Sequence, residues 1–181
     1  MKKILTLFLF SLIMNQNNNY KIDFGKDLKE TNWSVVNDGV MGGLSKGSAT
    51  LTNNSLLFKG TVSLDNNGGF SSLRSSFFDK DLSKFTSVKI KYKSTGISLA
   101  ISVAVSRRWY VPNYKMSLEG TNSKWKTTTI NLSDFRKYYI GKPMNETLDK
   151  NTLQDIIRIG FITNEKKYGD FEFEIDYIEF K

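Results

Sequence analysis

Residues 33–45 read Trp-Ser-Val-Val-Asn-Asp-Gly-Val-Met-Gly-Gly-Leu-Ser, and residues 66–74 read Asn-Asn-Gly-Gly-Phe-Ser-Ser-Leu-Arg. Each segment contains a Gly-Gly pair that follows Asn or Asp. Glycine adopts positive φ and permits close backbone approach, and Asn and Asp tolerate the same conformations. Each segment is therefore expected to be a tight turn that leads into a strand.

Strand-like patterns surround these two turns on both sides. Apolar residues alternate with polar ones, and residues 48–64 are expected to form a hairpin that turns at Asn53-Asn54. Further strands are expected at residues 70–75, 88–93, 97–105, 125–132, 157–162 and 171–180, with a long loop over 138–150. Eight to ten strands with at most one or two short helical turns predict an all-β, antiparallel β-sandwich or jelly roll.

Composition excludes several kinds of catalytic and metal site. The chain has 181 residues with neither cysteine nor histidine. Disulfides, lipoprotein attachment, Cys/His zinc sites and histidine-based triads are therefore excluded. The formal net charge is +8, but the basic residues are scattered among acids without a run of like charge. This pattern favours a lysine-rich soluble surface, and no nucleic-acid partner is expected.

The N-terminus has the pattern of an export signal. Lys2 and Lys3 precede an apolar run over residues 4–14, and a polar Asn-rich segment follows it. The run is too short to span a bilayer of about 30 Å but suits a signal peptide. We expect residues 1–19 to be a signal peptide with a polar spacer, residues 20–181 to be one β-sandwich domain, and the protein to be periplasmic or secreted. The alternative is an uncleaved segment that tethers the domain to a membrane.

The two turns also carry a family resemblance. The matching positions are Trp33, Asn37-Asp38-Gly39-Val40-Met41-Gly42-Gly43 and Ser45, then Phe58 and Gly60, then Asn67-Gly68-Gly69-Phe70, Ser72 and Arg74. Weaker matches follow at Trp125, Asp134-Phe135, Ile159-Gly160-Phe161, Gly169, Phe171, Ile175 and Ile178. Over residues 24–180 the chain resembles the complex I intermediate-associated protein 30 family.

That resemblance implies both a fold and a class of function. It implies a galactose-binding-like β-sandwich. The family includes a mitochondrial assembly factor for respiratory complex I, together with plant and bacterial relatives, and it supplies no catalytic residues to carry over. The resemblance thus implies a non-catalytic binding or assembly module that recognises a protein partner.

Asp38 is the first candidate site residue. It lies between Asn37 and Gly39, where an Asx turn to its own backbone is one interpretation. The other is an oxygen ligand for a structural Ca²⁺, which takes about six to eight oxygen ligands. No convergent acidic cluster is evident in the sequence, and no other cofactor is expected. The neighbouring Met41 is expected to pack into the core.

Arg74 is the second candidate. With Phe70 and Ser72 it occupies one face of a predicted strand, where an aromatic ring beside a bidentate donor would suit a sugar or a carboxylate. The alternative is a salt bridge to Glu172 or Asp176.

Residues 107–110, Arg-Arg-Trp-Tyr, form the most conspicuous aromatic and basic cluster. Trp109 and Tyr110 could stack on a sugar, with Arg108 beside them, or Trp109 could close the core with the arginines extended along it. The preceding strand has only small residues, Ser or Ala, at positions 98, 100, 102 and 104. That smooth face is either packed under a neighbouring segment or the floor of a shallow groove.

Two functions remain open at this point. A non-catalytic module that binds a protein partner follows from the family resemblance. An exported carbohydrate-binding module that uses an aromatic and arginine surface follows from the export signal, the predicted sandwich, and Trp109-Tyr110 with Arg74. An Asp/Glu-only hydrolase is disfavoured because no loop offers the paired carboxylates that glycoside hydrolysis needs.

Overall fold

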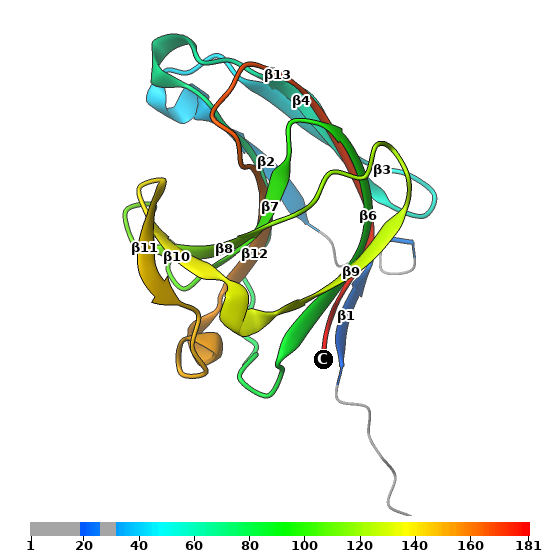
Figure 1. Ribbon diagram of the computed structural model, residues 1–181, viewed down its shortest axis with the longest axis vertical. Coiled ribbons are helices and arrows are strands. Elements are labelled where there is room, and N and C mark those ends of the chain that lie inside the picture. The colour runs from blue at the N-terminus through cyan, green and yellow to red at the C-terminus, as the bar shows by residue number, and fades with distance from the viewer. Residues whose placement is uncertain (1–18, 26–31) are drawn as a thin grey trace, which may run out of the picture.

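The computed structural model describes residues 19–25 and 32–181, so residues 1–18 of the predicted signal peptide and spacer lie outside the described residues. Two antiparallel sheets face each other (Figure 1). One has the order β3-β4-β13-β6-β9 with β1 also paired to β13, and the other has the order β11-β10-β8-β7-β12-β5-β2. The strands are β1 Tyr20–Asp23, β2 Trp33–Asn37, β3 Lys46–Leu51, β4 Leu56–Val62, β5 Ser71–Ser75, β6 Ser87–Gly96, β7 Leu99–Ala104, β8 Asn113–Ser117, β9 Lys126–Asn131, β10 Arg136–Tyr139, β11 Lys142–Thr147, β12 Arg158–Thr163 and β13 Gly169–Phe180.

The predicted β-sandwich of jelly-roll type is confirmed. Short 3-10 turns are more numerous than the one or two expected, with four in the described residues: η1 Asp38–Met41, η2 Asp65–Asn67, η3 Leu132–Asp134 and η4 Thr152–Asp155. Within residues 19–25 and 32–181, no helix has the length and apolar character needed to cross a membrane.

Alternation along the strands fills the space between the sheets. Leu73, Ile101 and Phe161 of the seven-stranded sheet are fully buried, as are Tyr92 and Phe173 of the six-stranded sheet. The rings of Phe161 and Phe173 lie 5.0 Å apart, centre to centre, and join the two layers. Because successive strand residues point to opposite faces, the residues between these core positions face outward.

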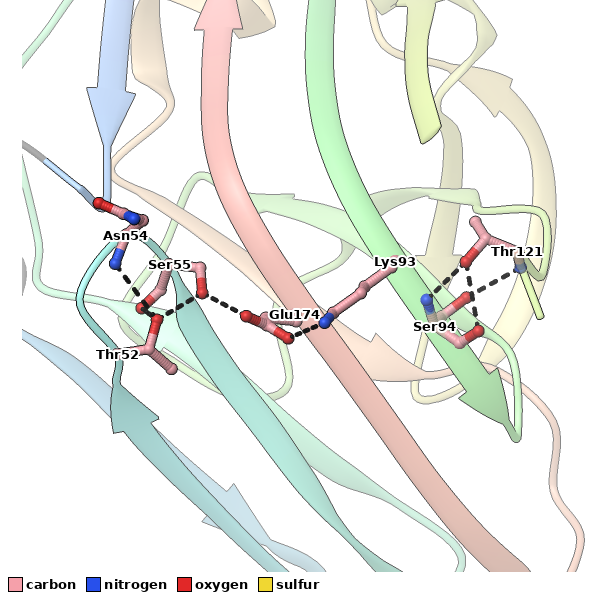
Figure 2. Close-up of polar contacts among 7 residues, drawn as sticks. All are labelled: Thr52, Asn54, Ser55, Lys93, Ser94, Thr121 and Glu174. Atoms are coloured by element: carbon pink, nitrogen blue, oxygen red, sulfur yellow. Dashed lines mark hydrogen bonds and ion pairs between the residues drawn. The ribbon is translucent and has the colours of Figure 1, made fainter. Parts of the chain in front are cut away.

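Two ion pairs lie on the outer face of the six-stranded sheet. Glu174 on β13 binds Lys93 on β6 at 2.7 Å and accepts a hydrogen bond from Ser55 at 2.5 Å. Figure 2 shows this row, which extends to Thr52 in the β3–β4 turn. Beside it, Lys91 binds Asp176 at 2.6 Å. Glu174 and Asp176 therefore pair with lysines of the neighbouring strand in their own sheet.

Two expectations about individual segments are wrong. Residues 138–150 do not form a long loop, since β10 and β11 make a hairpin there with a register shift between Arg136 and Tyr138. Residues 113–117, for which no strand was expected, form β8. These three strands make up one end of the seven-stranded sheet, where each is ordered mainly by pairing with its neighbour.

Candidate functional site: an arginine-lined cavity on the seven-stranded sheet

A cavity of about 190 Å³ lies on the outer face of the seven-stranded sheet. Its floor consists of small residues on the two central strands, Gly160 on β12 with Ser102 and Ala104 on β7. Side chains this short leave the sheet uncovered between longer neighbours on either side. Of the two interpretations of the smooth face at positions 98–104, the groove floor is therefore correct for Ser102 and Ala104. We call this space the arginine cavity.

One wall of the arginine cavity is formed by Arg74 on β5 and Arg158 on β12. Ser72 Oγ accepts a hydrogen bond from Arg74 Nε at 3.0 Å and donates one to the carbonyl of Val36 at 3.0 Å. Burial lowers the pKa of Arg74, and the positive charge of Arg158 lowers it further. Ser72 thus holds the partly buried guanidinium of Arg74 in place.

Arg158 lies against Phe77, whose ring centre is 3.7 Å from the guanidinium carbon. Arg107 stacks on the same ring at 4.3 Å. The Nε atom of Arg158 is buried and has no hydrogen-bond partner among the described residues. Burial lowers the pKa of Arg158, and the charge of Arg107 adds to that effect. The Phe77 ring therefore holds two arginines close together although their charges repel.

The opposite wall comes from Asn113 and Lys115 on β8 and Tyr138 on β10. Lys115 Nζ lies 4.0 Å from the centre of the Tyr138 ring and donates a hydrogen bond to Asn164 Oδ1 at 3.3 Å. Burial lowers the pKa of Lys115. Both partners are neutral, so they hold the Lys115 ammonium group in place without neutralising its charge.

The loop between β7 and β8 forms the rim. Arg108 and Trp109 line the cavity, and 73% of the Trp109 surface is exposed. Trp109 contacts Tyr110 edge to face at 5.9 Å. Trp109 therefore does not close the core, and its ring is available to a ligand.

Three of the predicted site residues meet in this cavity, namely Arg74, Arg108 and Trp109. The other three, Asp38, Phe70 and Tyr110, are not among its lining residues. The alternative salt bridge of Arg74 to Glu172 or Asp176 is wrong, because both acids belong to β13 in the other sheet. The sequence analysis did not predict Lys115 or Arg158 as site residues. Arg158 could have been found, because it lies on the same face of a predicted strand as Gly160.

Asp38 instead ties the two glycine turns together. It is 1% exposed, and its carboxylate accepts hydrogen bonds from the backbone N–H groups of Ser45, Gly69 and Phe70 at 2.9, 2.6 and 3.2 Å. The Ser45 hydroxyl donates a fourth at 2.5 Å. These N–H groups point at the oxygens a cation would need, and no group of three acids in the described residues could hold a metal. The surroundings of Asp38 therefore do not suit Ca²⁺.

Met41 is not a core residue. Val40, Met41 and Leu44 are 75%, 66% and 55% exposed, and Leu64 is 43% exposed. Asn66 Nδ2 donates to the carbonyl of Gly42 at 3.1 Å, which brings the two turns side by side. We call these four side chains the apolar turn patch.

Two further hollows lie on the outer face of the six-stranded sheet. The wider one, of about 590 Å³, contains Lys46 and Lys59 but also Asp170 and Glu172. The other, of about 450 Å³, lies beside Trp125 among the Lys91–Asp176 and Lys93–Glu174 pairs. Both are larger than the arginine cavity, yet their charges are mixed or already paired, so neither presents a comparable set of unpaired groups.

Solved structures share this fold. The family 11 carbohydrate-binding module of the cellulosomal cellulase Lic26A-Cel5E of Clostridium thermocellum superposes with a TM-score of 0.65 at 23% identity, over 90% of this chain and 93% of that chain. The Clostridium thermocellum module in complex with a beta-1,3-1,4-mixed-linked tetrasaccharide gives 0.61 at 24% identity, over 90% and 94%. An agarase gives 0.58 at 12% identity, over 90% of this chain and 24% of that one.

These likenesses concern the fold. No curated protein matches the sequence. Residues 22–175, which include both glycine turns, Arg74 and the whole of the arginine cavity, match the model of the family described as complex I intermediate-associated protein 30. The chain therefore belongs to the complex I intermediate-associated protein 30 family, with a galactose-binding-like β-sandwich.

Proposed function

We propose that this chain is an exported, non-catalytic carbohydrate-binding module that holds a glycan in the arginine cavity. The observation that carries the proposal is the exposed ring of Trp109 at the rim of a polar, side-chain-poor floor. Aromatic rings stack on the C–H faces of sugars, while nearby donors and acceptors bind the hydroxyl groups. Ser102, Asn113 and the guanidinium groups supply such partners.

Binding without hydrolysis fits the lining of the cavity. Glycoside hydrolysis uses two carboxyl groups roughly 5–9 Å apart. Among the described lining residues there is neither Asp nor Glu. The proposed export fits a glycan ligand, and a neighbour in fold has been captured with a mixed-linked tetrasaccharide. The single-domain organisation of residues 20–181 belongs to the same proposal.

Calorimetry on the purified domain with a panel of soluble polysaccharides tests this function. Trp109→Ala should weaken binding about tenfold, the loss expected for an aromatic anchor of about 1.4 kcal/mol. Trp125→Ala is the matched control, because Trp125 is 44% exposed but lies on the other sheet. Its affinity should stay within about twofold of wild type. The proposal fails if no glycan binds, or if both variants lose affinity equally.

A protein partner is the second candidate, and the apolar turn patch favours it. Three apolar residues of the first glycine turn, Val40, Met41 and Leu44, each expose more than half of their surface. Exposed apolar side chains that lie together mark interaction sites, and the family includes an assembly factor. Pull-down from cell envelopes should then recover one specific protein that a Val40→Ser/Met41→Ser variant loses. Equal recovery by both proteins would argue against this candidate.

A further inference from the structure

We infer that the glycan recognised by the arginine cavity is anionic, an oligosaccharide that carries carboxylate or sulfate groups on successive sugars. The inference rests on the proposed glycan-binding function and deepens it. Three observations support it: the cations that line the cavity, the buried Nε of Arg158 that has no hydrogen-bond partner among the described residues, and the pairing register of β5, β12, β7 and β8.

The cavity collects cations and no described anion. Arg74, Arg107, Arg108, Lys115 and Arg158 line it, and no acid does among the described lining residues. The sequence contains five arginines, and four of them line this cavity. The fifth, Arg136 on β10, is the strand partner of Lys115 on β8. Arginine binds carboxylate and sulfate-like groups through two parallel N–H donors.

The ion pairs of the described residues lie outside the cavity. The salt bridges of the described residues all use lysine: Lys21, Lys91, Lys93, Lys126, Lys137, Lys167 and Lys181 each bind an acid. The cations of the cavity have neutral neighbours instead, Ser72 for Arg74 and Asn164 for Lys115. Grouping like charges without counter-charges lowers stability, and a bound anion would remove that cost.

Arg158 provides a second, independent indication that the cavity binds an acceptor group. Its Nε is buried without a partner, and Phe77 holds its guanidinium in place from one side. A buried donor costs free energy unless it is hydrogen-bonded. An acidic group seated over Gly160 would lie beside both Arg158 and Arg74, since Gly160 is paired with Arg74 in the sheet.

The strand register spaces the cations for a chain-like ligand. One row of paired residues crosses the sheet as Arg74, Gly160, Ser102 and Lys115. Adjacent strands are about 4.8 Å apart, so the Arg74 and Lys115 backbones lie about 14 Å apart. The two small residues between them leave the floor open. Two cationic ends across an open floor suit a linear acid with at least two charged groups better than a single small anion.

The remaining features favour a saccharide over a nucleic acid. Proteins that bind single-stranded nucleic acid use several aromatic platforms for successive bases. Here Trp109 is the exposed ring among the lining residues, since Lys115 covers Tyr138.

Calorimetry with three probes of matched length tests the inference: oligogalacturonate, mixed-linkage β-glucan oligosaccharide and oligo-dT. Oligogalacturonate should bind most tightly, and its affinity should fall at least tenfold between 50 and 500 mM NaCl. Arg158→Met and Arg74→Met should each weaken it at least tenfold. Lys59→Met, which removes an exposed cation from the opposite sheet, should change it less than twofold.

Each other result has a definite meaning. Equal, salt-insensitive affinity for the neutral glucan would overturn the inference and leave the proposed glycan function standing. Binding of oligo-dT alone, or of no probe and no other polysaccharide in the panel, would overturn both. Thermal melts of each variant establish that a loss of affinity occurs in a folded protein.

Discussion

Asp38 Oδ2 accepts a hydrogen bond of 2.6 Å from the backbone N–H of Gly69, a residue 31 positions away in the chain. The bond joins the two glycine turns and fixes how β2 and β5 begin their pairing. An Ala Cβ at Gly68 would come within 2.6 Å of the same oxygen, so a side chain there would push the carboxylate away. The glycines of the second turn thus give Asp38 access to the backbone.

Asp38→Ala should lower the free energy of unfolding by about 2 to 4 kcal/mol, because it leaves three backbone N–H groups without acceptors in the turns. Urea denaturation measures this directly. Asp134→Ala is the control: Asp134 is exposed and accepts a single bond from Asn131 at 3.2 Å, so its effect should stay within about 0.5 kcal/mol. Similar losses for the two variants would show that the tie is dispensable.

Acid should weaken the same tie. Burial raises the pKa of Asp38, but hydrogen bonds from Ser45, Gly69 and Phe70 outweigh it and hold the pKa below its ordinary 3.8. The stabilisation is therefore complete above the unfolded pKa and is lost as pH falls through the folded one. The difference in unfolding free energy between wild type and Asp38→Asn should shrink steadily from pH 5 to below 3.8. A constant difference would contradict the assignment.

Alanine should destabilise the protein at one glycine of the first turn and leave its stability almost unchanged at another. A Cβ at Gly43 would lie 2.4 Å from Asp38 Cγ, whereas one at Gly39 would meet nothing within 4 Å. Gly43→Ala should cost about 2 kcal/mol through this clash, and Gly39→Ala should stay within about 0.5 kcal/mol. Thermal unfolding of both variants at one pH compares them, and equal melting temperatures would exclude the contact.

Removing the Arg158 guanidinium, whose buried Nε has no hydrogen-bond partner among the described residues, should make the protein more stable. Arg158→Met keeps an unbranched apolar stem against Phe77 while it removes a buried donor and a repelling charge. We expect about 1 kcal/mol of added unfolding free energy, since groups retained for binding commonly reduce stability. Denaturant midpoints of Arg158→Met and the surface control Lys59→Met provide the measurement. Destabilisation by Arg158→Met would mean that the guanidinium serves the fold.

Much of the sandwich follows from local pattern. The hairpin predicted over residues 48–64 is β3 and β4, and the strands predicted at 70–75 and 88–93 are β5 and β6. Alternation and glycine turns are local signals that long-range packing did not override. β11 lacks such local signals. It contains Pro143, and almost all of its residues are exposed, so apolar and polar residues do not alternate along it.

The site was only partly predictable for the same reason. Arg74 and Trp109 stand out in the sequence because their chemistry is unusual for their positions. Lys115 and Tyr138 belong to β8 and β10, whose strands have weak patterns, so nothing local places them opposite Arg74. Convergence of these residues depends on strand order, which brings β5, β12, β7, β8 and β10 together from distant parts of the chain.

The central position of β13 has a consequence for how quickly the chain acquires its structure. β13 pairs with β4 and β6 over its length, and its last residues pair with β1 through Tyr20 and Phe180. The middle of one sheet therefore cannot form until residues 169–180 have met strands that lie far earlier in the chain. Loop closure over such separations is slow, so folding of the sandwich should take milliseconds to seconds.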